Sequence, residues 1–532
     1  MRSSLYARPA GYGGMSVRVR RVVRGALSTG SMTLISNVTG LLRQLAFAWV
    51  FGAGRTMDAF LVASVVSQMV FGSIDAAISA TLIPVYSEFR MRSEKDAERF
   101  LRAVNGLVAV FAVMASLIVY VGAPVLVNLL APGFGGRESL LSSFLLRVMV
   151  PSMVFMGLSS VSAGFLQSRG VFGHPAAMNI PRNIVLILLA TWLGHRYGIS
   201  VLAWGSLLGA VLQLYVVLRP MRKLGTSLRL EWQPRHAGIV AMLRRLPSIF
   251  VNFFTLQAAL MVDRVLASGL PPGMISALNY SILLINFPLQ LFGSLAVALL
   301  PTLSELAVGE RGPSLSRAVR LPLRLTAFLV TPIALYTIFL RIPLLAIVYQ
   351  HGAFGQKALG DTAFAMLFFA LGMVSMAMNG ILGRTIFALG ETRVLFRTAF
   401  WSVGTTIATD LILVHPLAQG GLALGTTLGS WAGTLVLLLF LSRRLEGFRA
   451  GPIVSDVLWS SALALIAYGA TYLAYLRWHG PTLPHSLVHL ALLLIATFIV
   501  GTLLYLALQR LVGPMRGNLR RALREGKRAF NA

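Results

Sequence analysis

Ionisable side chains inside long apolar segments are the residues of this chain with the clearest chemical potential. The basic ones are Arg43, Arg147, Arg182, Arg264 and Arg341, and the acidic ones are Asp58, Asp75, Asp263 and Asp410. A charge at bilayer depth is costly unless it faces a bundle interior or a water-filled cavity. Each of these residues is therefore a candidate for binding or moving a charged group.

Some of these charges also have a purely structural interpretation. Arg182 and Arg341 lie near the ends of apolar segments, where a long side chain reaches the interface and keeps its charge in water. Asp263 precedes Arg264 directly, so the two form a local ion pair in one interpretation. The sequence leaves the structural and functional alternatives open for these residues.

Apolar segments that are long enough to cross a bilayer must position these charges. Hydrophobic residues make up 56% of the 532 positions and charged residues only 12%, with a mean hydropathy of +0.77. Runs of about 20 apolar residues predict about fourteen membrane-spanning helices. They are 27–51, 58–84, 103–130, 140–166, 174–194, 199–218, 246–268, 274–303, 325–350, 361–388, 395–414, 421–441, 455–476 and 486–508.

The distribution of basic residues predicts the topology. The net charge of +29 would indicate nucleic acid in a soluble chain, but here Lys and Arg concentrate in alternate links between spans. Cytoplasmic loops carry the excess of Lys and Arg, so both termini are predicted to be cytoplasmic, with no nucleic-acid partner. The few basic residues of the opposite links are Arg55, Arg137, Arg196, Lys357 and Arg477.

The chain lacks the residue patterns that several kinds of catalysis require. The chain has no cysteine, and its eight histidines are scattered without metal-ligand spacing. No glycine-rich run ends in Gly-Lys-Ser or Gly-Lys-Thr, the pattern of a nucleotide phosphate loop. The sequence therefore predicts a membrane transporter that is not an enzyme, is not driven by its own ATP hydrolysis and needs no cofactor.

An internal repeat predicts two similar lobes. The end of the second span, Ser79 to Glu88, resembles the end of the eighth, Ala296 to Glu305. Parallel six-helix repeats typically enclose a central cavity that opens alternately to each side. We expect an all-α polytopic membrane protein with two pseudo-symmetric lobes and two additional C-terminal helices. Its predicted parts are a basic N-terminus (1–25), an N-lobe (26–220), a cytoplasmic linker (221–245), a C-lobe (246–442), the last two spans (443–510) and a basic tail (511–532).

Ordered short motifs along nearly the whole chain resemble those of one transporter family. They include the stretch 39–44 (Thr-Gly-Leu-Leu-Arg-Gln), the stretch 51–54 (Phe-Gly-Ala-Gly), Asp58-Ala59-Phe60, the stretch 349–354 (Tyr-Gln-His-Gly-Ala-Phe) and the stretch 387–393. Together they resemble the MurJ (MviN) family of lipid II flippases, part of the larger MOP exporter superfamily to which the MATE transporters belong.

The resemblance implies a carrier of lipid II, the undecaprenyl-linked peptidoglycan precursor. Such a carrier works in peptidoglycan biosynthesis, cell-wall biogenesis and cell shape, moves its substrate across the bacterial inner membrane by alternating access, and has a cell-wall synthesis complex as a hypothetical partner. An anionic diphosphate needs cations in a wet cavity, and arginine pairs with phosphate oxygens through planar donors. The predicted substrate-binding residues are Arg43, Asp58, Asp75, Arg147 and Arg264, with Arg43 at the place of a cavity arginine in the family.

The chain departs from the family pattern at several positions of the expected cavity. Asn37 stands where the family's first helix usually has another arginine, and Gln44 stands where an acid normally follows Arg43. Apolar residues occupy 70–71 and 282–283, where the family has an arginine pair and an Asp-Arg pair. Such a cavity has few cations for a diphosphate, unless Arg147 and Arg264 are used instead.

A cation site is the second site that the resemblance implies. Some relatives resemble sodium-coupled carriers, and the corresponding residues here are Asp263, Thr406, Asp410 and Thr427. Thr406 and Asp410 are four residues apart and share one helix face. Carboxylate and hydroxyl oxygens suit a hard cation. Asp410 as a proton carrier, or as a buried acid paired with Arg264, remains an equal alternative.

Three functions remain in competition at the level of the sequence. The first is a lipid II flippase, and the second is a flippase for another polyprenyl-linked saccharide. The third is a MATE-like cation or drug antiporter, or a non-transporting partner of a cell-wall complex. An antiporter should have a compact cavity dominated by acids, whereas a scaffold should tolerate the loss of Arg43.

Overall fold

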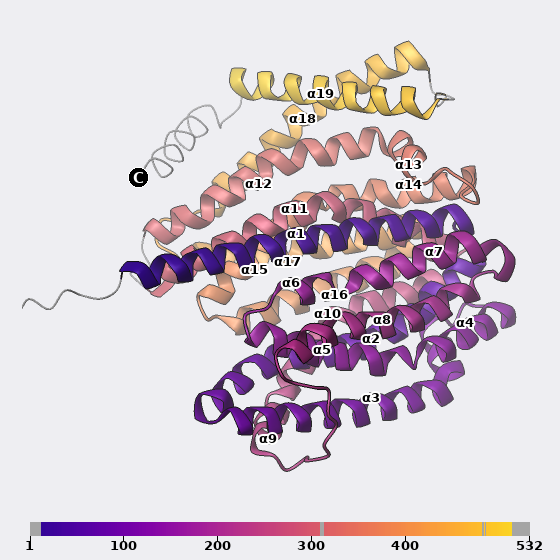
Figure 1. Ribbon diagram of the computed structural model, residues 1–532. Coiled ribbons are helices and arrows are strands. Elements are labelled where there is room, and N and C mark those ends of the chain that lie inside the picture. The colour runs from indigo at the N-terminus through magenta and orange to yellow at the C-terminus, as the bar shows by residue number, and fades with distance from the viewer. Residues whose placement is uncertain (1–11, 309–312, 481–483, 485, 513–532) are drawn as a thin grey trace, which may run out of the picture. The chain divides into compact units, whose positions relative to one another are not determined.

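The computed structural model describes residues 12–308, 313–480, 484 and 486–512, and within them every regular element is an α-helix. Residues 1–11 of the predicted basic N-terminus and residues 513–532 of the predicted basic tail lie outside the described residues. The helices, in chain order, are α1 (Tyr12–Phe51), α2 (Arg55–Arg92), α3 (Glu94–Leu130), α4 (Gly136–Met149), α5 (Ser152–Ser168), α6 (Gly173–Ala177), α7 (Asn179–Tyr197), α8 (Ser200–Lys223), α9 (Ala237–Leu243), α10 (Leu246–Ser268), α11 (Met274–Val308), α12 (Pro313–Phe339), α13 (Arg341–Tyr349), α14 (Gln356–Leu371), α15 (Met373–Ala388), α16 (Thr392–Leu417), α17 (Gln419–Arg444), α18 (Ala450–His479) and α19 (Leu487–Leu511) (Figure 1).

Each of the predicted apolar segments is helical. Among the described residues, nine helices are long and apolar enough to cross a membrane, and two bent helix pairs bring the number to as many as 11. The other predicted spans fall on α10, α11 and α16, which are helical over the predicted ranges. The all-helical membrane fold is therefore confirmed, and the predicted number of about fourteen spans is consistent with the helices observed.

Two predicted spans bend by more than 40° in their middle. The segment 140–166 contains α4 and α5, which meet at an angle of 43°. Pro151 at this break has no N–H to continue the helical ladder, and the hydroxyl of Ser116 donates to the carbonyl of Val150 at 3.2 Å. The segment 361–388 contains α14 and α15, which meet at 47° at Gly372. Ser375 donates to the Gly372 carbonyl at 2.9 Å, so a nearby hydroxyl accompanies each break.

The chain forms two compact units. Unit 1 contains residues 1–47, 63–126 and 142–253, and unit 2 contains residues 48–62, 127–141 and 254–532. The two short segments 48–62 and 127–141, which precede the predicted lobe boundary in sequence, thus pack with the C-terminal helices. The turn between α1 and α2 accounts for part of this: the N–H of Ala353 donates to the Trp49 carbonyl at 2.8 Å.

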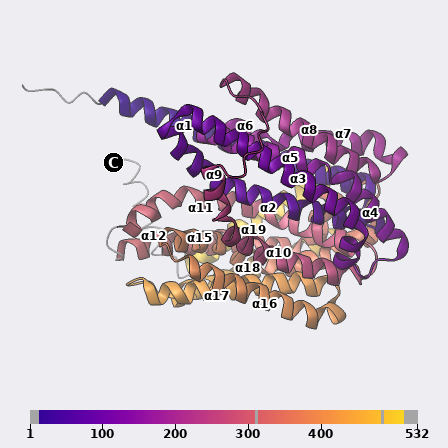
Figure 2. The same ribbon diagram turned by 90° about the horizontal axis from the view of Figure 1, so that it is seen from below.

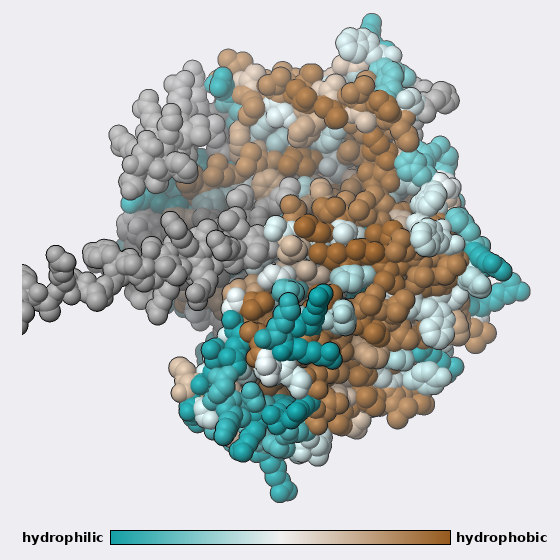
Figure 3. All heavy atoms as spheres, in the orientation of Figure 1, coloured by the Kyte–Doolittle hydropathy of each residue, from teal (hydrophilic) through white to brown (hydrophobic). Residues whose placement is uncertain are grey.

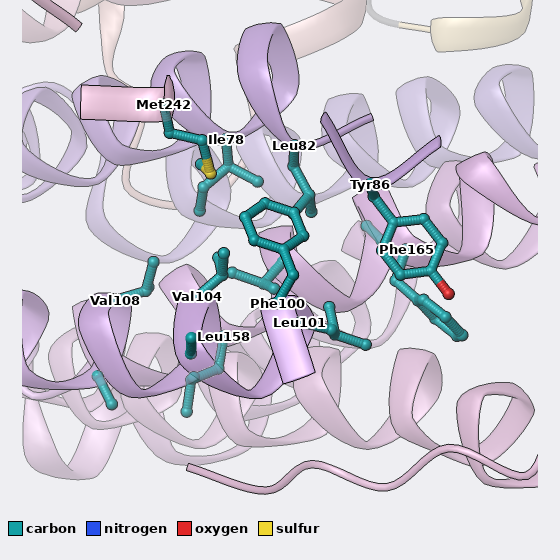
Figure 4. Close-up of a cluster of buried hydrophobic side chains, with 14 of the residues drawn as sticks. Ile78, Leu82, Tyr86, Phe100, Leu101, Val104, Val108, Leu158, Phe165 and Met242 are labelled. Atoms are coloured by element: carbon teal, nitrogen blue, oxygen red, sulfur yellow. The ribbon is translucent and has the colours of Figure 1, made fainter. Parts of the chain in front are cut away.

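The core of unit 1 lies among α2, α3, α5, α8 and α9 (Figure 4). Leu82 and Phe100 are fully buried. Tyr86 meets Phe165 edge-on with ring centroids 5.5 Å apart, and Phe89 stacks on Phe100 at 5.4 Å. Aromatic pairs at such distances stabilise beyond the area that they bury. This cluster joins the α2 and α3 ends to the short helix α9.

Unit 2 is organised by pairs of long helices. The helices α16 and α17 pack along each other (Figure 2), as do α12 with α18 and α18 with α19. The last helix, α19, is joined to α12 by buried tyrosines, because Tyr336 on α12 donates to the Leu494 carbonyl at 2.8 Å and Tyr505 on α19 donates to the Phe328 carbonyl at 3.0 Å. The two additional C-terminal helices are therefore integral to unit 2.

Large apolar side chains remain exposed along the helices. Ile118 is 66% exposed and Val121 69% exposed on α3, and Leu492 is 63% exposed on α19. Apolar residues cover much of the displayed face in Figure 3, while hydrophilic residues gather toward helix ends and loops. Exposed apolar surface of this extent is expected where lipid tails are the solvent.

Candidate functional site

Arg43 is held on α1 by a residue of α7. Its guanidinium donates to Asn183 Oδ1 at 3.0 Å. Asn183 in turn donates to the Ser36 carbonyl at 3.3 Å and to Thr39 Oγ1 at 3.1 Å. The Nε of Arg43 is buried and makes no hydrogen bond within the described residues. Asn183 therefore orients the guanidinium without neutralising it.

A second cation stands beside Arg43. Arg182 precedes Asn183 on α7 and is close enough to Arg43 for the two charges to repel each other. Its Nε is also buried without a hydrogen-bond partner among the described atoms. Sequence reasoning left Arg182 between a structural and a functional role, and the apolar pattern alone holds no signal for its proximity to Arg43.

Asp75 and Arg147 occupy other parts of unit 1. The carboxylate of Asp75 on α2 accepts a hydrogen bond of 2.5 Å from Ser160 on α5. Arg147 on α4 donates to the Tyr120 carbonyl on α3 at 3.2 Å and lies 5.6 Å from the centroid of the Tyr120 ring. Tyr120 is exposed, so Arg147 lies at the surface of unit 1 rather than beside Arg43.

The carboxylate of Asp58 on α2 is hydrogen-bonded to the start of α11. Its carboxylate accepts hydrogen bonds from the Gly273 N–H at 2.6 Å, the Ser276 N–H at 2.8 Å and the Ser276 hydroxyl at 2.5 Å. The first N–H groups of a helix have no intrahelical acceptors, and a negative charge is favourable there. These contacts fix the start of α2 to the start of α11 and favour a structural role.

The turn that precedes Asp58 requires glycine. Gly52 has φ of +64°, and a Cβ at this position would collide with the carbonyl of Ala353. The carbonyl of Gly52 accepts a hydrogen bond of 3.1 Å from the buried hydroxyl of Tyr280. Only glycine combines this backbone conformation with so close a contact. The turn and Asp58 together attach segment 48–62 to unit 2.

Arg264 lies between acids. It donates to the Ile275 carbonyl at 3.4 Å, and both Asp263 and Asp58 are near enough to attract its charge. Arg264 thus has two acids within reach of its charge, in contrast to Arg43 and Arg182, although its Nε is likewise buried without a hydrogen-bond partner among the described residues. Arg341 donates to the Ile338 carbonyl one turn earlier at 2.7 Å, which agrees with its structural interpretation.

Asp263 on α10 and Asp410 on α16 form a pair of neighbouring carboxyl groups, called here the carboxyl pair. Asp410 is completely buried. Both of its oxygens and Oδ1 of Asp263 are buried without a hydrogen-bond partner in the described part of the chain. Two such groups are stable side by side only if they share a proton or a cation.

Glycines of α17 bring it close to the carboxyl pair. A Cβ at Gly425 would collide with Asp410 Oδ1 and would lie 3.1 Å from the Thr406 carbonyl oxygen. A Cβ at Gly429 would collide with Thr406 Oγ1. Small residues of this kind allow membrane helices to approach closely. The predicted proximity of Thr406 and Asp410 on one face of α16 therefore appears as a shared contact with α17.

Thr427 is directed elsewhere. Its hydroxyl donates to the Phe368 carbonyl on α14 at 2.8 Å, and a Cβ at Gly372 would lie 2.7 Å from that hydroxyl oxygen. The predicted cation ligands therefore divide into a set near Asp410 and a threonine that faces α14. Within the described residues no group of three or more His, Cys, Asp or Glu side chains converges, so a cation there would depend on the carboxyl pair with hydroxyl or carbonyl oxygens.

Known proteins resemble this chain over most of its length. The family model described as "Lipid II flippase MurJ" matches residues 47–493. The lipid II flippase MurJ of Burkholderia cenocepacia is 28% identical over 432 residues, covering 79% of this chain and 84% of the relative. A probable lipid II flippase MurJ of Vibrio cholerae is 26% identical over 521 residues, covering 94% of this chain and 98% of the relative.

Solved structures resemble the fold. A structure of lipid II flippase MurJ in an inward closed conformation superposes with a TM-score of 0.79 at 23% identity, covering 92% of this chain and 99% of that one. An inward-facing MATE multidrug transporter of the MOP superfamily has a TM-score of 0.66 at 15% identity, covering 80% and 99%. These likenesses confirm the expected fold. Because the family model spans most of both units, the chain belongs to the MurJ family of lipid II flippases.

Proposed function

We propose that this chain carries lipid II from one leaflet of a bacterial inner membrane to the other. The observation that carries the proposal is the match of the MurJ family model to residues 47–493, which include most of the spans of both units. The expected activity is transport and not catalysis, since a flippase moves its substrate without changing a covalent bond.

The charges of unit 1 support an anionic cargo. Lipid II has a diphosphate between its saccharide and its polyprenyl tail. Arg43 keeps its charge inside an apolar segment, with Asn183 rather than an acid as its hydrogen-bond partner. A guanidinium in this position gains a strong, charge-assisted partner when a phosphate oxygen arrives. The polyprenyl tail is apolar and stays in the hydrocarbon throughout.

The carboxyl pair supports coupling to a cation. Three buried carboxylate oxygens of Asp263 and Asp410 have no hydrogen-bond partner within the described part of the chain, and a monovalent cation such as sodium suits such hard oxygens. The carbonyl oxygen of Thr406 and Oδ1 of Asp410 both lie against Gly425, while the Thr406 hydroxyl donates to the Ser402 carbonyl at 3.0 Å. Our proposal assigns the sodium site to the carboxyl pair with Thr406, leaving Thr427 outside it. A shared proton is the competing occupant, and the sodium dependence of stability separates the two.

The location and partners follow from the same proposal. Lys and Arg concentrate in alternate links between spans, which supports an inner-membrane protein with both termini in the cytoplasm. A carrier of this precursor delivers it to the enzymes that polymerise peptidoglycan, so a cell-wall synthesis complex is the expected partner.

Another polyprenyl-linked saccharide is the second candidate cargo. Gln44 stands where the family pattern has an acid, and its Oε1 is buried without a hydrogen-bond partner in the described structure. A neutral amide there favours a headgroup with different polar substituents. The diphosphate contacts of Arg43 would be the same for both cargoes.

Complementation distinguishes the two cargoes. The chain and an Arg43→Ala variant are expressed in cells depleted of their lipid II flippase, and survival and precursor accumulation are followed. We expect rescue by the native chain and loss of rescue by Arg43→Ala, with Arg341→Ala as a control that removes a span arginine of structural role. Failure of a membrane-inserted native chain would transfer the assignment to another lipid-linked saccharide.

A further inference from the structure

Arg182 lies near the charge of Arg43, and within the described residues no acid forms an ion pair with it. Its stem packs on α8 at Gly209, where an added Cβ would lie 2.8 Å from Arg182 Cγ and 3.0 Å from its Cα. This close approach of α7 and α8 leaves the stem little freedom. Gly209 therefore fixes the direction in which the Arg182 guanidinium leaves the helix.

The two guanidinium groups form an uncompensated pair, called here the arginine pair. Neither Arg43 nor Arg182 has a salt bridge within the described residues. The nearest predicted intramembrane acid of unit 1, Asp75, is held by Ser160 on another helix. Arg264, by comparison, has two acids in its surroundings. A chain gains no stability from two like charges at bilayer depth, so a ligand is the natural counterion.

The geometry of the arginine pair suits an oxyanion with several oxygens. Asn183 accepts from Arg43 and follows Arg182 in the chain, so the same turn of α7 brings both arginines into one neighbourhood. Among the atoms that the structure describes, the Nε of each is buried without a hydrogen-bond partner, and Nε with a terminal nitrogen forms the fork that binds phosphate bidentately. Two guanidinium groups in one neighbourhood offer more donors than one, which suits a diphosphate better than a single carboxylate.

We propose that Arg182 binds the diphosphate of the transported lipid together with Arg43, and that Asn183 is the positioning residue of the pair. This inference rests on the proposed function and adds a substrate-contacting residue from α7. The charge that Arg182 brings costs stability in the empty carrier and is offset when the anion binds. Ligand affinity and ligand-free stability therefore respond to Arg182 in opposite directions.

The test measures lipid II binding by the purified full-length chain in phosphatidylcholine nanodiscs. The variants are Arg182→Gln, Arg182→Lys and the control Arg196→Gln, which removes a charge from the same helix where the arginine lies over the Tyr197 ring. We expect Arg182→Gln to weaken the Kd about tenfold or more and Arg196→Gln to leave it unchanged. Equal binding by Arg182→Gln and Arg196→Gln would overturn the inference.

Ligand-free thermal midpoints provide the readout that a merely structural arginine would not give. We expect the midpoint of Arg182→Gln to equal or exceed that of the native chain, because repulsion with Arg43 is removed. A lowered midpoint together with weakened binding would overturn the binding role. Should Arg182→Gln fail to insert, Arg182→Lys decides: it keeps the charge and loses the fork, so unchanged binding would contradict the inference.

Competition with inorganic pyrophosphate tests whether the arginine pair recognises a free diphosphate or only the diphosphate within the lipid. Competition by pyrophosphate that disappears in Arg182→Gln supports recognition of the diphosphate alone. Binding of lipid II that depends on Arg182 without such competition supports recognition of the diphosphate within the lipid. If the native chain binds no lipid II, the proposed function fails. Pyrophosphate binding to the native chain then decides the inference. Binding that is lost in Arg182→Gln supports the inference, and no binding of pyrophosphate overturns it.

Discussion

The carboxylate of Asp58 accepts hydrogen bonds from both the N–H and the hydroxyl of Ser276, at 2.8 and 2.5 Å. Residues far apart in sequence thus fix the beginning of α2 to the first turn of α11. We expect Asp58→Ala to lower the free energy of unfolding by about 1–3 kcal/mol, because buried N–H donors lose their acceptor. Thermal unfolding in detergent measures the change.

The control for Asp58 is Asp361→Ala. Asp361 lies near the start of α14, and its carboxylate accepts no hydrogen bond from the residues that the structure describes. Its replacement should leave the thermal midpoint nearly unchanged. A similar midpoint for Asp58→Ala and Asp361→Ala would contradict the structural role of Asp58.

The carboxyl pair predicts a sodium-dependent stability. We expect the thermal midpoint of the native chain to rise when sodium chloride replaces choline chloride at equal ionic strength, since a bound cation stabilises the folded state by about 2.7 kcal/mol at a hundredfold excess over its Kd. Asp410→Asn should abolish the rise. Thr427→Val should retain it, because the Thr427 hydroxyl donates to Phe368 on α14. A sodium response that survives Asp410→Asn would exclude the carboxyl pair as the site.

The ion pair between Arg324 on α12 and Asp456 on α18 predicts a strong coupling of these helices. The Nε of Arg324 donates to Asp456 Oδ2, and one of its terminal nitrogens donates to Asp456 Oδ1 at 2.9 Å. The side chain of Asp456 is 2% exposed. Removing one partner of a buried pair costs about 3–5 kcal/mol, whereas replacing both by apolar residues is often neutral. We therefore expect Asp456→Ala to lower the thermal midpoint far more than the double variant Arg324→Met with Asp456→Leu.

An exposed ion pair provides the comparison for that prediction. Arg92 and Glu88 are joined at 2.8 Å on α2, with side chains 68% and 54% exposed. Such pairs contribute about 0–1 kcal/mol, so Glu88→Ala should change the midpoint little. Equal losses from Glu88→Ala and Asp456→Ala would contradict the assignment of the α12–α18 pair as a buried contact.

His236 predicts a pH dependence outside the membrane-spanning segments. Its Nδ1 accepts the Gly238 N–H at 3.1 Å at the start of α9, and its ring lies 5.3 Å from that of Phe89 and 5.7 Å from that of Phe100. Burial lowers the pKa of His236 below its usual value. A depressed histidine pKa means that the folded state favours the neutral ring, so stability is complete above the unfolded pKa of about 6.5 and is lost as the pH falls below it.

Hydrogen exchange measures this effect locally. We expect the amides of α9 to exchange faster at pH 5.5 than at pH 7.5 after correction for the intrinsic rate, because the protonated ring no longer accepts from Gly238. His236→Asn should reduce this dependence, since its amide remains an acceptor at both values and asparagine is a good N-cap. Protection of α9 that is the same at both pH values in the native chain would contradict the prediction.

Much of the fold follows from the sequence, because the bilayer imposes length and hydropathy on every span. The predicted segment 246–268 coincides with α10, and the predicted segment 421–441 lies inside α17. The breaks at Pro151 and Gly372 were not predicted, although both residues weaken a helix. Apolar content continues across such a break, so hydropathy alone does not indicate where one span bends.

The candidate site follows from the sequence only in part. Intramembrane charge identified Arg43, Asp263 and Asp410 as candidates, and the structure brings the two acids together. The partnership of Arg43 with Asn183 and Arg182 joins residues on different helices, and no local pattern encodes which helices are neighbours. The direction of Thr427 depends in the same way on the rotation of α17 about its axis. Both are tertiary properties that a single sequence does not reveal.

Translocation by the purified chain is the most direct test of its proposed activity. Liposomes with the reconstituted chain and lipid II are treated from outside with a membrane-impermeant reagent that modifies the headgroup, and the modified fraction is followed over time. We expect the native chain to expose lipid II from the inner leaflet progressively, and Arg43→Ala to leave that pool protected. A native chain, correctly folded, that exposes no more lipid II than protein-free liposomes would contradict the function proposed for it.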